Sequence, residues 1–185
     1  TVVAINDTDP FYAYGKRVAF GLDRQDRAAY QRAADFLNSS GAEVVCLQHE
    51  FGVYGGPEGS HLLELLRRLK VPLVTTLHTV LTHPNDLQNQ IMAELIERSE
   101  QLIVMTDYTR GLLCEHYQTP PAQVTVIPHG IPETPWPNKP AARRRLGLEG
   151  RTLLLTFGLL SPGKGIEDAL RGVAQVAAQF PDLLY

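Results

Sequence analysis

The chain has 185 residues, a formal net charge of -3, and 44% hydrophobic and 20% charged residues, which is ordinary for a globular protein. A weakly acidic chain gives no electrostatic reason to expect nucleic acid as a partner, and the short basic run Arg143–Arg145 is expected to be a solvated helix face. No segment has the roughly 18 consecutive apolar residues of a membrane span, and Cys46 and Cys114 are expected to be small buried side chains in a reducing, cytoplasmic compartment.

Short aliphatic runs alternate with amphipathic runs along most of the chain. In chain order this pattern predicts strands at residues 2–5 and 18–20, a helix at 27–37, a strand at 43–47, a helix at 58–69, a strand at 72–77 and a helix at 86–98. It then predicts a strand at 101–105, a helix that is capped by Thr106 and ends at His116, and a strand at 124–127. A short helix at 141–146, a strand at 152–157 and a helix at 165–179 follow. Such alternation is typical of a parallel α/β sheet with right-handed crossovers, so we expect a Rossmann-like sheet with helices on both faces.

The segment 128–140 changes character, because it holds five prolines and Trp136. Proline-rich composition is typical of a linker, so we expect a first domain at 1–134, and at 135–185 a linker with the first strand–loop–helix of a second Rossmann-like domain. The chain begins in a strand-like run and ends where another strand starts. We therefore expect a fragment that lacks a first strand and most of the second domain.

Polar residues follow several predicted strands, and ligands of open parallel sheets bind at this edge. His78 follows the strand at 72–77 and is the strongest candidate, because a neutral imidazole can donate or accept a hydrogen bond to a sugar or phosphate oxygen. His49 and Glu50 follow the strand at 43–47; they are candidates for binding acceptor hydroxyls or for pairing with each other. His129 follows the strand at 124–127 and either contacts ligand or shapes the turn.

Two glycine-rich loops open onto predicted helices. Gly55 and Gly56 lie in the first loop, which is either a backbone site for a ligand or a flexible connection. The second loop contains Gly158, Gly163 and Lys164, and it could bind a diphosphate through its amides and the lysine charge. The loop does not complete a P-loop motif, because Gly165 stands where serine or threonine is required.

Four segments together resemble the group 1 retaining glycosyltransferases with the GT-B fold. They are Leu47–Glu50, Thr75–Thr79, Val126–Ile131 and Phe157–Gly165. The resemblance implies two Rossmann-like domains, the first binding acceptor and the second a nucleotide sugar, with transfer that retains the anomeric configuration.

The resemblance also implies residue roles. His78 matches the histidine near the transferred sugar, and Lys164 matches the lysine that binds the donor diphosphate, with no cofactor and no metal required. The implied partners are a nucleotide-sugar donor and a sugar, lipid or other small-molecule acceptor, with possible peripheral membrane contact. The chain departs from the family pattern in two places: Leu159 replaces the usual diphosphate-binding arginine, and His129 replaces the usual asparagine.

Three alternatives stay open at this point. A sugar-nucleotide epimerase or glycan phosphorylase has the same architecture, and a non-catalytic carbohydrate- or nucleotide-binding domain would fit a fragment. A metal hydrolase using His49, Glu50, His78 and His83 is disfavoured, because no H-E-x-x-H or similar ligand pair is present. We expect the 185-residue chain alone to be inactive, and an unfinished second domain to favour homo-oligomers.

Overall fold

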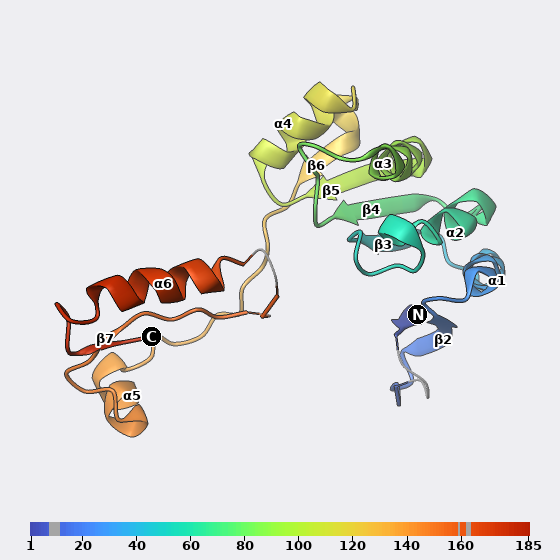
Figure 1. Cartoon of the computed structure of the whole chain (residues 1–185). Helices are drawn as coiled ribbons and strands as arrows, with labels where there is room; N and C mark the ends of the chain where they lie inside the picture. Colours follow the sequence, from blue (N-terminus) through green and yellow to red (C-terminus); the bar gives the residue numbers. More distant parts are fainter. Residues whose placement is uncertain (8–11, 159, 162–163) are drawn as a thin grey trace. The chain divides into compact units, whose positions relative to one another are not determined.

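The chain forms two compact units, Thr1–Gly130 and Ile131–Tyr185. The structure is a computed structural model that describes residues 1–7, 12–158, 160–161 and 164–185 (Figure 1). The division between the units lies near the boundary that the sequence predicts, between residues 134 and 135. Both units combine parallel strands with helices, and this confirms the predicted α/β, Rossmann-like fold class.

The first unit is built on a four-stranded parallel sheet in the order β3-β4-β5-β6 (Figure 1). Its strands are β3 (Val45–His49), β4 (Leu73–Leu77), β5 (Ser99–Val104) and β6 (Val124–Val126). The two strands that precede them, β1 (Val2–Asn6) and β2 (Val18–Asp23), pair with each other in parallel as a separate sheet. The continuous sheet expected from the sequence is therefore divided into two within the described part of the first unit.

Helices connect the strands in the alternation that the sequence predicts. They are α1 (Arg27–Ser39), the short 3-10 helix η1 (Pro57–Gly59), α2 (Leu62–Arg68), α3 (Asp86–Arg98), α4 (Asp107–His116) and the 3-10 helix η2 (Pro121–Gln123). Helix α1 packs against α2, α2 against α3, and α4 against β5 and β6. Thr106 caps α4 as predicted, because its hydroxyl accepts from the backbone N–H of Thr109 at 3.1 Å.

The two faces of the four-stranded sheet differ in burial. Leu47, Thr75 and Leu102 are neighbours in register and are all buried. One residue further along each strand, Gln48 is exposed and its register partner Thr76 is only partly buried. The prediction that Cys46 is buried is wrong, because Cys46 shares the face of Gln48 and is exposed.

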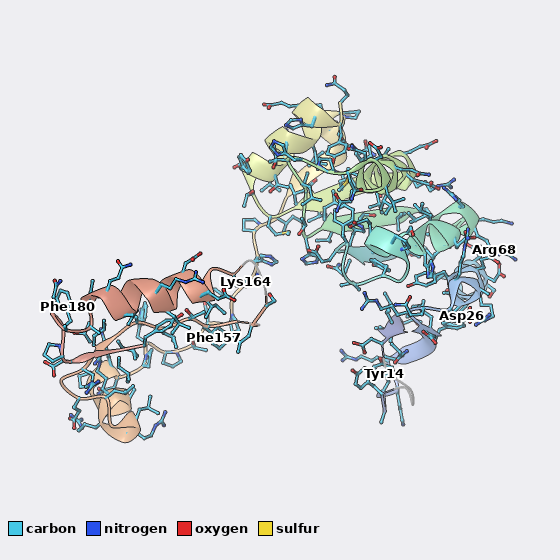
Figure 2. The ribbon with its side chains drawn as sticks, viewed as in Figure 1. Tyr14, Asp26, Arg68, Phe157, Lys164 and Phe180 are labelled. Atoms are coloured by element: carbon cyan, nitrogen blue, oxygen red, sulfur yellow. The ribbon has the colours of Figure 1, made fainter. Side chains whose placement is uncertain are left out.

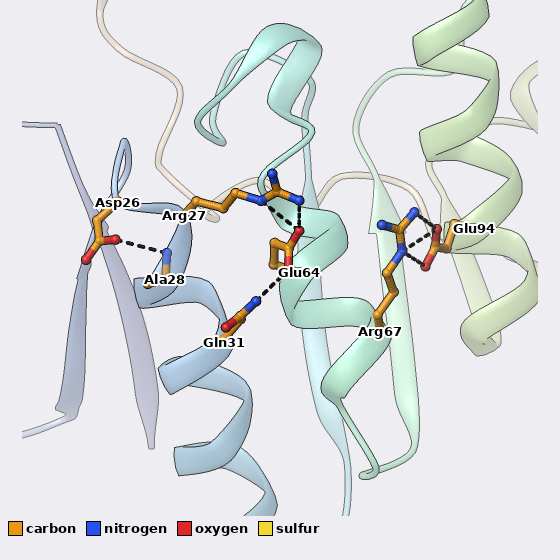
Figure 3. A network of polar contacts seen from close by, with 7 residues as sticks. All are labelled: Asp26, Arg27, Ala28, Gln31, Glu64, Arg67 and Glu94. Atoms are coloured by element: carbon orange, nitrogen blue, oxygen red, sulfur yellow. Dashed lines mark hydrogen bonds and ion pairs between the residues drawn. The ribbon is translucent and has the colours of Figure 1, made fainter.

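Polar contacts join helices α1, α2 and α3 across the surface (Figure 3). Arg27 and Gln31 of α1 both donate to the carboxylate of Glu64 on α2, the amide at 2.7 Å. Arg67 of α2 donates hydrogen bonds through two of its nitrogens to the carboxylate of Glu94 on α3, at 2.9 to 3.2 Å. Exposed ion pairs contribute little one at a time, so the buried leucines beneath them remain the main source of stability.

The second unit is smaller and more exposed. It contains α5 (Lys139–Leu146), β7 (Thr152–Leu153), α6 (Ile166–Val176) and β8 (Leu183–Leu184), and the two strands pair in parallel. The strand predicted at 152–157 is shorter in the structure, because β8 pairs only with its first residues. Phe157, labelled in Figure 2, is 96% exposed and Leu155 is 75% exposed. None of the helices in the described ranges is long and apolar enough to cross a bilayer.

Candidate functional site

A group of polar side chains lies where β3 and β4 end. His49, the last residue of β3, is paired in register with Leu77, the last residue of β4. The backbone N–H of His78 continues this pairing by donating to the carbonyl of His49 at 3.0 Å. The carboxyl ends of two neighbouring strands therefore bring Gln48 and Glu50 beside His78, at the edge where parallel sheets bind ligands.

His78 is exposed and hydrogen-bonded to a neighbouring strand. Its Nε2 lies 2.8 Å from Oε1 of Gln48. The amide nitrogen of Gln48 in turn donates to the hydroxyl of Thr76 at 3.4 Å. Among the described residues only one ring nitrogen of this exposed imidazole is hydrogen-bonded, and the second can pair with a ligand. The role of His78 in binding stays a prediction.

Glu50 is held by two donors rather than by a charged partner. The hydroxyl of Thr79 donates to one carboxylate oxygen at 2.6 Å, and the backbone N–H of Phe51 donates to the other at 3.0 Å. These bonds fix the carboxylate beside the residue that follows His78. The side-chain pair between Glu50 and His49 that the sequence left open is absent from the bonds among the described residues.

His49 points away from this polar group and into the core. Its side chain is 1% exposed and packs between two aromatic rings, edge-on to Phe51 with centroids 4.9 Å apart and stacked on Tyr54 at 6.0 Å. Burial lowers the pKa of His49 from 6.5 to about 4, so the ring is neutral at pH 7. The expected contact of His49 with acceptor stays a prediction, and its observed position is beneath the site.

His129 lies beside His78 in the first unit. The two imidazole rings stack with centroids 6.0 Å apart and an angle of 26° between their planes. His129 is exposed, as is the segment of chain that follows it. The third histidine predicted for the site is therefore close to the first, on a segment that follows the sheet's last strand.

Gly55 and Gly56 belong to a loop that packs tightly against its surroundings. A Cβ atom on Gly55 would lie 1.8 Å from the carbonyl oxygen of Arg24, and Gly56 has a φ of 76° with the His61 ring close by. The N–H of Gly55 already donates to the hydroxyl of Tyr30 at 2.9 Å. Close packing accounts for both glycines without a ligand, and the expected role of these residues in sugar binding stays a prediction.

The remaining candidates belong to the second unit. Lys164 is exposed, and it directly precedes Gly165, which caps α6 with a left-handed φ of 67° (Figure 2). Gly158 is exposed and has a φ of 146°, a conformation that favours glycine. Gly163 lies outside the described residues, and so does Leu159, the position of the expected arginine. Among the described residues, no three His, Cys, Asp or Glu side chains are arranged to hold a metal ion.

Three residues of this polar group were given no role in the sequence predictions: Gln48, Thr76 and Thr79. A signal was available for Thr76. Residues two apart on a strand share a face, so Thr76 and His78 point the same way. Gln48 is the register neighbour of Thr76, and this pairing became visible only in the folded sheet.

A parallel α/β unit with hydrogen-bonding groups at the carboxyl edge of its sheet belongs to the broad class of open-sheet, ligand-binding domains. The chain matches the family described as Glycosyltransferase Family 4 over residues 9–134. The chain therefore belongs to this glycosyltransferase family, and the resemblance read from the sequence is confirmed.

Three relatives whose names state a glycosyltransferase function are consistent with this assignment. The D-inositol 3-phosphate glycosyltransferase of Rhodococcus jostii is 30% identical over 182 residues, which cover 88% of this chain and 39% of the relative. The protein of the same name from Stackebrandtia nassauensis is 38% identical over 99 residues, or 52% of this chain and 21% of the relative. The protein of this name from Nocardioides sp. is 32% identical over 134 residues, or 63% of this chain and 28% of the relative. The chain thus spans well under half the length of these relatives.

Proposed function

We propose that this chain forms the acceptor-side unit and the beginning of the donor-binding unit of a glycosyltransferase that takes its sugar from a nucleotide sugar. One observation carries the proposal: in a chain of this family, His78, Gln48, Glu50 and Thr79 converge at the carboxyl edge of a parallel sheet. These groups are an imidazole, an amide, a hydroxyl and one carboxylate, a set of donors and acceptors suited to sugar hydroxyls.

In the proposed reaction, the first unit binds and orients the reacting sugar and the acceptor. His78 hydrogen-bonds the transferred sugar or the acceptor hydroxyl, and Glu50, held by Thr79, accepts from a second hydroxyl. Bonds of this kind fix the reacting oxygen relative to the anomeric carbon, which lowers the entropic part of the barrier. His129 covers one side of the His78 ring.

The second unit supplies positive charge in this proposal. Lys164 and the backbone of the loop from Gly158 to Gly165 bind the diphosphate, which becomes the leaving group. Fixed positive charge and helix-terminal N–H groups stabilise the charge that develops on a departing diphosphate. We further propose transfer with retention of the anomeric configuration and without a required metal, and that the 185-residue chain alone has no activity.

A donor screen tests this function. A protein that carries this chain together with a complete donor-binding unit is assayed with radiolabelled nucleotide sugars, in the parent and in Lys164→Ala. Loss of a charged contact to phosphate should weaken use of the donor by roughly 10- to 100-fold. Lys139→Ala, which removes another exposed lysine of the same unit, serves as the control and should leave the rate unchanged. Binding of sugars without transfer from any donor would instead favour a non-catalytic carbohydrate-binding domain.

A further inference from the structure

Gln48 sits where it can control the chemistry of the His78 ring. The two side chains come from neighbouring strands and share the less buried face of the sheet, since Gln48 is the register partner of Thr76 and His78 lies two residues beyond Thr76. The contact between Gln48 Oε1 and His78 Nε2 is 2.8 Å long. This length is typical of a full hydrogen bond.

The orientation of the Gln48 amide decides which ring nitrogen carries the proton. In the structure its NH2 group faces the hydroxyl of Thr76 at 3.4 Å and its oxygen faces the imidazole. An amide oxygen can only accept, so with the amide in this orientation Nε2 of His78 carries the proton. In a neutral imidazole the other nitrogen, Nδ1, then carries the lone pair.

The backbone of Gln48 is fixed independently of its side chain. The hydroxyl of Tyr54 donates to the Gln48 carbonyl at 2.5 Å, and the Tyr54 ring is stacked on the buried ring of His49. The aromatic packing in the core thus holds the strand end from which the amide reaches His78. A preorganised donor–acceptor chain of this kind has little freedom to reorient when a ligand arrives.

We propose that Gln48 is a positioning residue that keeps His78 in the tautomer protonated at Nε2, so that Nδ1 accepts a hydrogen bond from a ligand hydroxyl. The inference rests on the proposed function, and it deepens that function by naming the ligand chemistry. An unprotonated nitrogen accepts from a hydroxyl but cannot donate to a phosphate oxygen. The His78 side of the site therefore selects a hydroxyl of a sugar or polyol.

Nitrogen NMR of the 185-residue chain, selectively labelled in histidine, tests the tautomer without any assay of activity. Spectra are recorded at a pH where histidines are neutral. Gln48→Leu removes the acceptor, and it should lower the ratio of the Nε2-protonated to the Nδ1-protonated form of His78 by roughly fivefold, the effect of one hydrogen bond. Gln48→Glu keeps an acceptor at the same place and should keep the ratio at or above its parental value. The exposed His83 provides an internal reference whose ratio stays constant.

Two results would overturn the inference. The first is an Nδ1-protonated His78 in the parent, which would mean that the amide presents its nitrogen to the ring. The second is an unchanged ratio in Gln48→Leu while its circular dichroism remains that of the parent. A chain that also contains a complete donor-binding unit separates the two proposals: Gln48→Leu should lower kcat/KM for sugar transfer about 10-fold. A tautomer shift without sugar transfer in any variant would reject the proposed function and leave the positioning role of Gln48 in place.

Discussion

The buried imidazole of His49 should make the stability of the first unit depend on pH. In the folded chain the ring is 1% exposed, and burial lowers its pKa to about 4. In the unfolded chain its pKa returns to about 6.5. Below pH 6.5, His49 therefore takes up a proton when the chain unfolds. In the folded state the ring is protonated only when the pH approaches 4.

The sign and the size of the effect follow from these two values. Because the pKa of His49 is lower in the folded state than in the unfolded state, the stability that the neutral ring contributes is fully present above pH 6.5. This stability is lost as the pH falls toward 4. A pKa difference between 6.5 and about 4 corresponds to a loss of about 3 kcal/mol in the free energy of unfolding, at about 1.4 kcal/mol per pKa unit. A loss of this size is a large fraction of the stability of a small domain.

Urea unfolding followed by circular dichroism at several pH values from 7.5 to 4.5 provides the assay. Other titrating groups contribute to the parent's pH dependence, so the parent is compared with His49→Leu, which fills a similar volume without a titratable group. The free energy of unfolding should fall more steeply with acid in the parent, and the two curves should diverge by about 2 kcal/mol or more. His83→Gln, which removes an exposed histidine, should keep the parental curve. Parallel curves for the parent and His49→Leu would refute the reasoning.

Two further predictions concern packing in each unit. Gly55→Ala should destabilise the first unit by about 3 kcal/mol or more in urea unfolding, because the new methyl group would lie 1.8 Å from a backbone oxygen. The control is Gly52→Ala, in the same loop, where no atom lies within 4 Å of the added carbon; it should cost less than about 1 kcal/mol. Equal losses in both variants would contradict the packing described. Phe157 is 96% exposed in the second unit, so we expect concentration-dependent self-association in sedimentation velocity that weakens in Phe157→Ser. Tyr108→Ser, which removes a side chain that is 70% exposed in the first unit, should have no such effect, and a monomeric parent at all concentrations would reject this prediction.

Most elements of the fold could be predicted from local patterns in the sequence. The helix at 86–98 was predicted from its amphipathic pattern with the bounds that the structure gives α3, where Asn85 and Gln88 form a capping box at the start. The helix predicted at 58–69 begins later, as α2, since Glu58 and Gly59 both have positive φ values. No local pattern revealed this, because glutamate rarely adopts that conformation.

The site was harder to predict, because its geometry depends on strand register. The strand predicted at 43–47 runs instead from Val45 to His49. This displacement turns His49 from a loop residue into a strand residue that faces the core, and it makes Gln48 the neighbour of His78. The close approach of Gly55 to Arg24 was equally hidden, since the two residues meet only through tertiary packing.

The most direct test of the central claim is the rate of sugar transfer in His78→Ala, measured in a protein that joins this chain to a complete donor-binding unit. If the polar group around His78 holds the reacting sugar or acceptor, kcat/KM should fall by roughly 10- to 100-fold, the effect of a hydrogen bond lost in the transition state. His83→Ala, which removes an exposed histidine outside this group, should transfer sugar at the parental rate. Equal rates in His78→Ala and the parent would contradict the assignment of this site.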